Sequence, residues 1–324
     1  MPTKVMKQSW LFIGPRLLAG IGQVTNRYAE LLRADGHTTE YVEFGQQPVR
    51  SEYDRGFAFV LPTVDHMKIT DELASRCKKV MYMTICETEP VNPVYGMLAK
   101  YGKLYVASDF CKEVFSRQFP NIQWEVLRLF AAAPPTIPKQ IQGPYVFYTI
   151  GNIMDPRKNI KGLVDAYLRC GFGSAAHLVL KATCLQEVNW RLPGVTIING
   201  LLSDADLEKV HEGCHCYVNC SHSEGVGMGA VEAALRSKPV VITDYGGLKE
   251  YVHTPWVVKC TKGPIGFNDF LFTADQEWGY PSGEDLQRCL KDCFEKKVTT
   301  WDHSHTNELM LGVQRHPCWL DDQD

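Results

Sequence analysis

The sequence has no apolar run that approaches the ~20 residues a membrane-spanning helix needs, so no transmembrane segment is expected. It also lacks an excess of one charge. The formal net charge is −3, which gives no reason to expect a nucleic acid or an anionic membrane as partner. The short apolar run before Arg16 is typical of a first strand and not of a signal peptide. A soluble globular protein is therefore expected.

Paired C-x2-C motifs are absent, although the chain has twelve cysteines. They are scattered through apparent strands and helices, which indicates reduced, buried thiols in a cytoplasmic protein rather than disulfides. One stretch of twelve residues could suggest zinc, because it contains His211, Cys214, His215, Cys216, Cys220 and His222. However, 216–221 resembles a buried strand, whose alternate side chains turn away from each other. No metal site is predicted.

The length of 324 residues favours two domains, because single cores rarely grow past ~250 to 300 residues. Strand and helix patterns alternate over the first ~125 residues, with one helical stretch expected at 71–78. A proline-rich linker follows at 131–144, and the alternation restarts at Tyr145. We predict an α/β protein with two doubly wound domains, 1–135 and 136–296. The tail, 297–324, has little periodicity and could pack back on the first domain.

The most informative stretch is 217–251, YVNCSHSEGVGMGAVEAALRSKPVVITDYGGLKEY. It is typical of a strand, a glycine-rich loop, a helix from about Ala230 to Ser237, and a second buried strand. Glu224 precedes the glycines and Glu232 lies inside the helix. Any function proposed for the chain has to explain these two carboxylates.

A dinucleotide-binding site is one interpretation, because Gly225 to Ala230 fits G-x-G-x-x-G/A and Asp244 follows 19 residues after Gly225. The four residues between strand and first glycine disagree with the tight turn that this motif needs. Glu224 would also place a negative charge beside a pyrophosphate. A nucleotide sugar fits better, since two separated carboxylates can accept hydrogen bonds from hydroxyls at both ends of such a ligand.

SHSEGVGMGAVEAALRSKPVVITDYGGLKEYV resembles the hallmark segment of the family 4 (group 1) retaining glycosyltransferases. The E-x7-E signature falls on Glu224 and Glu232, and a trailing G-G-x-x-E on Gly246, Gly247 and Glu250. Similarity extends to 149–167 and 199–218 and, more weakly, to 19–37 and 107–115, and EWGYPSGEDLQRCL resembles a late W-x-x-P…L helix. The resemblance implies the GT-B fold, two Rossmann-like doubly wound domains facing across a cleft.

The resemblance also implies roles for residues of the second domain. Glu224 would meet the donor sugar and Glu232 the ribose, while the turn after Glu224 would present N–H groups to the diphosphate. This turn consists of Gly225, Val226, Gly227 and Met228. Lys158 matches the lysine that neutralises the diphosphate in the family. Asn152 stands at the position of the family arginine, and Arg157 is the obvious substitute.

The first domain departs further from the family. Gly20 and Gly22 match its first loop, where the backbone approaches the phosphates, although a plain tight turn is the alternative. The stretch MYMTICETEPVNP lacks the histidine that many members carry, and offers Glu87 as a residue of the acceptor or donor-sugar site. His222 is expected at the rim of the donor site.

The expected activity is retaining, metal-independent hexosyl transfer from a UDP- or GDP-sugar to a hydroxyl of a glycan or another acceptor. By analogy with the family, the departing phosphate helps to deprotonate the acceptor, so no cofactor, metal or protein base is needed. Two alternatives stay open. One is a degenerate relative that binds a nucleotide sugar or glycan without turnover, and the other is an NAD-dependent oxidoreductase.

Overall fold

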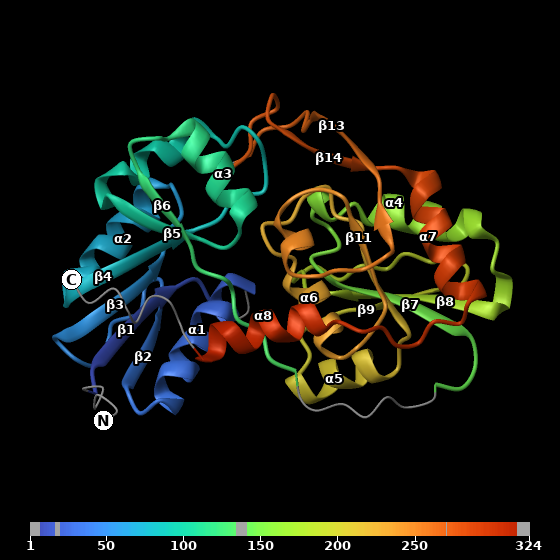
Figure 1. Ribbon diagram of the computed structural model, residues 1–324, viewed down its shortest axis with the longest axis horizontal. Helices are drawn as coiled ribbons and strands as arrows, with labels where there is room; N and C mark the ends of the chain where they lie inside the picture. The colour runs from blue at the N-terminus through green and yellow to red at the C-terminus, as the bar shows by residue number, and fades with distance from the viewer. Residues whose placement is uncertain (1–6, 17–19, 134–140, 270, 316–324) are drawn as a thin grey trace. The chain divides into compact units, whose positions relative to one another are not determined.

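The computed structural model describes residues 7–16, 20–133, 141–269 and 271–315. The chain divides into two compact units, and in Figure 1 the parallel sheet of the first is coloured blue to teal and that of the second green to orange. Unit 1 comprises Met1–Ala131, Phe267–Ala274 and Leu311–Asp324, and unit 2 comprises Ala132–Gly266 and Asp275–Met310. Residues 134–140 of the linker and 316–324 of the tail lie outside the described residues.

Unit 1 is a parallel sheet with the strand order β2-β1-β3-β4-β5-β6 (Figure 1). Its core contains the inward side chains of the sheet, such as Leu11 and Val106, and buried residues of the helices, such as Phe115. The strands are β1 (Ser9–Gly14), β2 (Thr38–Glu43), β3 (Tyr53–Phe59), β4 (Cys77–Thr84), β5 (Lys103–Val106) and β6 (Gln123–Val126). The helices are α1 (Gly20–Ala34), α2 (Val64–Ala74), η1 (Pro93–Tyr101) and α3 (Asp109–Gln118).

Unit 2 is a second parallel sheet, with the order β12-β11-β10-β7-β8-β9. Its strands are β7 (Tyr145–Gly151), β8 (Ala176–Ala182), β9 (Val195–Ile198), β10 (Cys216–Asn219), β11 (Val240–Thr243) and β12 (Val257–Val258). The helices are η2 (Pro156–Lys158), α4 (Ile160–Cys170), η3 (Gly173–Ala175), α5 (Asp204–Glu212), α6 (Met228–Leu235), η4 (Gly247–Glu250) and α7 (Gly283–Glu295). The last helix, α8 (Ser304–Arg315), belongs to unit 2 up to Met310 and to unit 1 from Leu311. Two Rossmann-like parallel-sheet units confirm the predicted fold class.

Three elements differ from the sequence-based expectation. The helix expected at 71–78 is α2, which begins at Val64 and ends before β4. Its first turns contain β-branched residues of low helix propensity, and burial of Met67 and Leu73 together with the Thr63 cap stabilises them. The segment EWGYPSGEDLQRCL, which resembles a late family motif, is helical only from Gly283, where α7 begins. Residues Glu277–Pro281 form β14, which pairs antiparallel with β13 (Cys260–Pro264). The tail, expected to lack periodicity, contains α8.

Helix caps explain several element boundaries. Ser108 accepts a hydrogen bond from the Cys111 N–H at the start of α3, and Ser203 accepts one from the Asp206 N–H at the start of α5. Ser282 does the same for Asp285 in α7. Each cap satisfies an N–H that has no partner inside its helix. Across the described part of the chain, none of the helices combines the length and apolar character that a membrane crossing requires.

Candidate functional site

The site lies where the strand order of unit 2 reverses. β7 and β10 are neighbours in the sheet, and the chain leads from β7 to one side and from β10 to the other. Their following loops, 152–159 and 220–227, therefore diverge from the same edge and leave room for a ligand. This topological switch point holds Arg157, Lys158 and Glu224.

Hydrogen bonds join the two loops directly. The His222 N–H donates to the Arg157 carbonyl at 2.8 Å, and Asn159 Nδ2 donates to the Cys220 carbonyl at 3.2 Å. Arg157 Nη1 donates to the Ser223 carbonyl at 2.8 Å. The loop after β7 is thus attached to the loop after β10 at three residues that directly precede Glu224.

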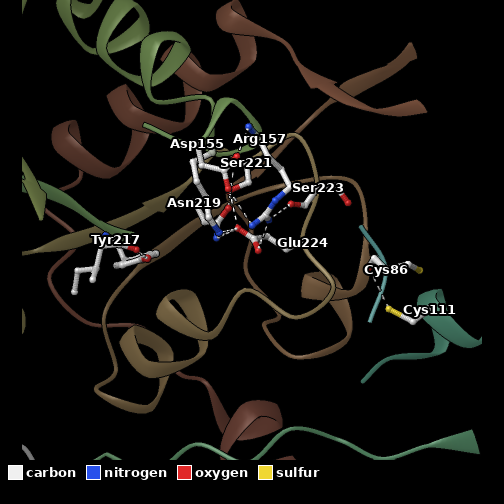
Figure 2. A network of polar contacts seen from close by, with 11 residues as sticks. Cys86, Cys111, Asp155, Arg157, Tyr217, Asn219, Ser221, Ser223 and Glu224 are labelled. Carbon is white, nitrogen blue, oxygen red and sulfur yellow. Dashed lines mark hydrogen bonds and ion pairs between the residues drawn. The ribbon is translucent and has the colours of Figure 1, made fainter. Parts of the chain in front are cut away.

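Glu224 is the centre of a buried network, shown in Figure 2. Its Oε2 accepts a hydrogen bond from Arg157 Nη1 at 2.9 Å, and its Oε1 accepts one from Lys158 Nζ at 2.5 Å. Ser221 Oγ and Asn219 Nδ2 also donate to Oε1, at 2.7 and 3.4 Å. Only 5% of the surface of Glu224 is exposed, and its carboxylate accepts hydrogen bonds from four side chains.

The electrostatic balance keeps Glu224 ionised. Burial alone would raise the pKa of this carboxyl, since it penalises the charged form. The charges of Lys158 and Arg157, with hydrogen bonds from Lys158 and Ser221, outweigh burial and hold the pKa well below its usual range. The group is a permanent hydrogen-bond acceptor at physiological pH and cannot act as a general acid there.

Glycines bring the backbone close to Glu224. Gly246 has φ +84°, and a Cβ there would lie 2.5 Å from the Glu224 carbonyl oxygen. The neighbouring Gly247 N–H donates to that same oxygen at 2.8 Å. The Gly246–Gly247 pair therefore supports the backbone of Glu224, which gives a packing reason for the trailing G-G-x-x-E pattern.

The glycine-rich turn after Glu224 leads into α6. Gly227 has φ +76° and φ/ψ values of the left-handed region, so it ends the turn in a conformation that glycine adopts without strain. α6 starts at Met228, two residues before the predicted start, so Gly229 lies in its first turn. The first N–H groups of a helix have no partner inside it and can bind an anion.

Tyr217 lies beneath this turn and connects it to β7. Its hydroxyl donates to the Ile150 carbonyl at 3.1 Å, and a Cβ on Gly229 would lie 2.3 Å from the hydroxyl oxygen. Burial, above all, raises the pKa of Tyr217, and the negative charges of Glu224 and Glu232 raise it further. Both glutamates thus act on one side chain, although Glu224 is buried in a loop and Glu232 half-buried on α6.

A pocket opens at this edge of unit 2. Its lining includes Lys158, Asn219, Ser221, Glu224, Gly227 and Met228. Four of these were predicted as site residues from the sequence. Asn219 and Ser221 were not, although Ser221 is the serine of the S-x-x-E motif and could have been found from it. Their contacts with Glu224 make them part of the site.

Three residues predicted for the donor site are absent from the lining of this pocket, although they lie in the same two loops. Asn152 is exposed, and its Oδ1 accepts a hydrogen bond from the Met154 N–H at 3.2 Å, within its own loop. Val226 is 2% exposed and belongs to the core, next to the buried Gly225. His222 stacks on Trp278 with ring centroids 4.8 Å apart, and its Nδ1 contacts the Gly279 carbonyl at 2.9 Å.

The predicted residues of the first domain lie in unit 1. Gly20 and Gly22 are in the first turn of α1, and residues 17–19 of the loop before them lie outside the described residues. A Cβ on Gly22 would lie 2.3 Å from the Arg16 carbonyl oxygen, whereas a Cβ on Gly20 would meet none of the described residues within 4 Å. Glu87 is half-buried in the loop after β4. Their roles in a donor or acceptor site stay predictions.

The histidine and cysteine cluster has separate partners. His211 Nδ1 lies 2.7 Å from the Tyr148 hydroxyl, and His215 Nδ1 accepts a hydrogen bond from the Val146 N–H at 2.9 Å. Among the residues that the structure describes, no group of three or more His, Cys, Asp or Glu side chains is placed to hold a metal. Over the same residues, eleven cysteines are free thiols.

Comparison with known proteins agrees with this site. Residues 189–255 match the family "Glycosyl transferases group 1". This range includes Ser221, Glu224 and Glu232, so the resemblance found from the E-x7-E signature is confirmed. No curated protein matches the chain.

Solved structures resemble the chain over almost its whole length. A glycosyltransferase from Rickettsia africae is 12% identical with a TM-score of 0.60, covering 96% of this chain and 93% of that one. The structure described as "Trehalose-6-phosphate from E. coli bound with UDP-2-fluoro glucose" is 10% identical with a TM-score of 0.65, covering 97% and 98%. A UDP-forming trehalose-phosphate synthase from Burkholderia xenovorans is 9% identical with a TM-score of 0.62, covering 98% and 97%. The chain therefore has the GT-B fold, and its segment 189–255 carries the signature of the group 1 glycosyltransferases.

Proposed function

We propose that the protein is a retaining glycosyltransferase that moves a sugar from a UDP- or GDP-sugar to a hydroxyl of a glycan or another acceptor. The observation that carries the proposal is the buried, ionised Glu224 beside Lys158 at the switch point of unit 2. A carboxylate kept ionised at this edge accepts hydrogen bonds from sugar hydroxyls, and a lysine beside it binds phosphate.

In the proposed complex, Lys158 and the first N–H groups of α6 contact the diphosphate. They stabilise the negative charge that develops as the glycosidic bond breaks. Glu224 accepts a hydrogen bond from a hydroxyl of the donor sugar. Among the described residues its Oε2 accepts one hydrogen bond, from Arg157, and a carboxylate oxygen has two acceptor positions. Glu232, eight residues further on, accepts the ribose hydroxyls.

The proposed reaction needs no metal and no protein base, because the cation and the backbone hold the diphosphate and the departing phosphate takes the acceptor proton. The similar structures support this direction through the ligands in their descriptions, a UDP-sugar analogue in one and UDP formation in another. The cytoplasmic location expected from the sequence stays a prediction.

A second candidate is a protein that binds the nucleotide sugar without turnover. It is favoured by Asn152, which replaces the arginine of the family, is exposed, and contacts its own loop. One cation fewer at the diphosphate weakens the electrostatic part of catalysis more than it weakens binding, if the charge grows in the transition state.

The test is a thermal-shift panel of UDP, GDP and ADP and of their glucose and mannose conjugates, since a ligand of the folded state raises its melting temperature. The stabilising donor is then incubated with an acceptor panel, with and without EDTA, and the anomeric configuration of the product is read by NMR. Transfer that survives EDTA, retains configuration and is abolished by Glu224→Gln supports the enzyme.

Donor binding without turnover on any acceptor, water included, would favour the second candidate. A panel in which no nucleotide raises the melting temperature would contradict both.

A further inference from the structure

The two cations beside Glu224 are adjacent in sequence but differ in how firmly they are held. Arg157 Nη1 donates to two acceptors, the Ser223 carbonyl and Glu224 Oε2, and its Nη2 lies 3.4 Å from Asp155 Oδ2. The backbone of Arg157 is fixed as well, since its N–H donates to Asp155 Oδ1 at 2.9 Å. Its side chain is 11% exposed.

Lys158 is held by much less. Its Nζ contacts Glu224 Oε1 at 2.5 Å, its side chain is 23% exposed, and it lines the pocket. Arg157 is absent from the lining of that pocket. Moving Lys158 toward a ligand breaks one ion pair, whereas moving Arg157 toward a ligand also releases the loop that carries Glu224.

The two departures leave Glu224 in different states. Without Lys158, Oε1 keeps its hydrogen bonds from Ser221 and Asn219, and Oε2 keeps its ion pair with Arg157. If both cations left, a buried carboxylate would remain with neutral donors alone, which costs several kcal/mol or forces it to take up a proton. The arrangement therefore tolerates the loss of one cation, and Lys158 is the one that is free to leave.

We propose that the two cations have separate roles: Lys158 passes from Glu224 to the diphosphate of the bound donor, while Arg157 stays on Glu224 as a positioning residue and does not touch the diphosphate. The inference rests on the proposed function. It assigns Arg157 a role different from that of the missing family arginine. In the empty site Glu224 takes the place of the phosphate as the anion that Lys158 binds.

The charge balance supports the exchange. The side chains of Arg157, Lys158, Glu224 and Asp155 carry two positive and two negative charges, so the cluster is neutral before a ligand arrives. A diphosphate carries more negative charge than one carboxylate and attracts Lys158 more strongly. After the exchange, Glu224 remains an anion with Arg157, Ser221 and Asn219 as donors, and it is in place for a sugar hydroxyl.

Isothermal titration of UDP, GDP and ADP into the full chain tests the proposal, comparing wild type with Lys158→Gln, Arg157→Gln, Arg157→Lys and Glu224→Gln. Lys158→Gln should weaken binding by about tenfold or more, because a charged hydrogen bond to phosphate is lost. Glu224→Gln should strengthen it by about threefold, because no anion then competes for Lys158. Arg157→Lys should bind within about twofold of wild type.

Proton uptake gives the readout that a merely structural role would not change. Titrations at about pH 6 in two buffers of different ionisation enthalpy report the protons taken up on binding. In Arg157→Gln, nucleotide binding removes the last cation from the buried Glu224, so the carboxyl should take up a proton. Arg157→Gln should take up more protons than wild type does, and Arg157→Lys should match wild type, since the proton exchange of the nucleotide's own terminal phosphate is common to all three.

Each outcome is decisive. If either Arg157 variant weakens binding as much as Lys158→Gln does, Arg157 is a ligand of the diphosphate and the proposal is wrong. Unchanged or weaker binding by Glu224→Gln would exclude the exchange while leaving the proposed function intact. If Arg157→Gln does not fold, the affinity of Arg157→Lys decides the question. No binding of any nucleotide to wild type would remove the proposed function itself, and the exchange with it.

Discussion

Both units have a topological switch point, but the two points are built from different groups. In unit 1 the strand order reverses between β1 and β3, and in unit 2 between β7 and β10. Around the first, backbone and neutral groups make the close contacts described next, among the residues that the structure describes. The Tyr41 hydroxyl donates to the Pro15 carbonyl at 2.5 Å, and α1 packs so closely that Gly22 has no room for a Cβ. Around the second, ionised side chains meet in a buried network.

The difference separates what a fold provides from what a sequence adds. In a doubly wound sheet, the loops on either side of the switch point run in opposite directions, whatever residues they contain. Both units therefore have a place where a ligand could lie. Charge and hydrogen-bond acceptors at that place are a property of the side chains. Unit 2 has them in Glu224 and Lys158, which is why the proposed donor site is placed there.

The largest effect is expected from Glu224→Ala. It leaves Arg157 and Lys158 without their common anion in a buried site, which should lower the free energy of unfolding by about 3–5 kcal/mol. Urea unfolding followed by tryptophan fluorescence measures the change. The matched control is Asp244→Asn, because Asp244 pairs with Lys249 at 2.7 Å while both side chains are nearly half exposed. That change should cost less than about 1 kcal/mol.

A small loss in Glu224→Ala, similar to that in the control, would contradict the comparison. It would mean that the network contributes as little as a surface ion pair and that the two switch points differ in appearance only.

Much of the fold could be predicted from the sequence, because short apolar runs typical of strands alternate with stretches that have the periodicity of a helix. β9, Val195–Ile198, is a run of β-branched residues, and the Ser203 cap marks the start of α5. The β13–β14 hairpin was not predicted, since Gly263, Pro264, Gly279 and Pro281 make both strands poor in strand formers. Its pairing depends on contacts in the folded unit, such as the stacking of Trp278 on His222.

The site was predicted in its residue types more than in its contacts. The E-x7-E spacing and the lysine motif were enough to select Glu224 and Lys158. No local pattern could show that Arg157, 67 residues before Glu224, bonds to it, because that contact requires the two loops to be side by side. The sequence likewise could not show that Asn152 turns into its own loop.

Gly246→Ala is expected to have the second largest effect. A Cβ would press on the Glu224 carbonyl oxygen at 2.5 Å, and the backbone has φ +84°, so the loss should be about 2–4 kcal/mol. Gly266→Ala is the control, since Gly266 has φ +79° but nothing within 4 Å of its Cβ, and it should cost about 1 kcal/mol. Equal losses in urea unfolding would show that strain in φ is the whole effect and that support of Glu224 adds nothing.

A pH dependence should come from two buried histidines of unit 2, His211 in α5 and His215 just before β10. Burial lowers the pKa of His211 to about 3 and, with the same leading cause, that of His215 to about 4. Both stay neutral in the folded state while the unfolded chain binds protons below about pH 6.5, so stability falls as the pH falls. Between pH 6.5 and 5, His211 alone should lower the free energy of unfolding by about 2 kcal/mol. Urea unfolding of wild type and His211→Gln at both pH values measures the effect, and a slope unchanged in the variant would contradict it.

The smallest effect concerns the switch point of unit 1 and compares Gly22→Ala with Gly20→Ala. Both glycines lie in the first turn of α1, where alanine is the better helix former by up to about 1 kcal/mol. At Gly22 the added Cβ meets the Arg16 carbonyl oxygen at 2.3 Å, so a net loss of about 1–2 kcal/mol is expected. At Gly20 the Cβ meets nothing within 4 Å, so the variant should be as stable as wild type or slightly more stable.

Binding of the nucleotide identified by thermal shift then sharpens the result. If these glycines serve backbone packing alone, Gly20→Ala binds as wild type does. If the backbone of the loop approaches the phosphates, as the family resemblance implies, Gly20→Ala weakens binding without weakening the fold, because a side chain would occupy space that the ligand needs. The first outcome keeps the contrast between the two switch points. The second outcome would mean that unit 1 contributes to donor binding through its backbone, whereas unit 2 contributes through charged side chains.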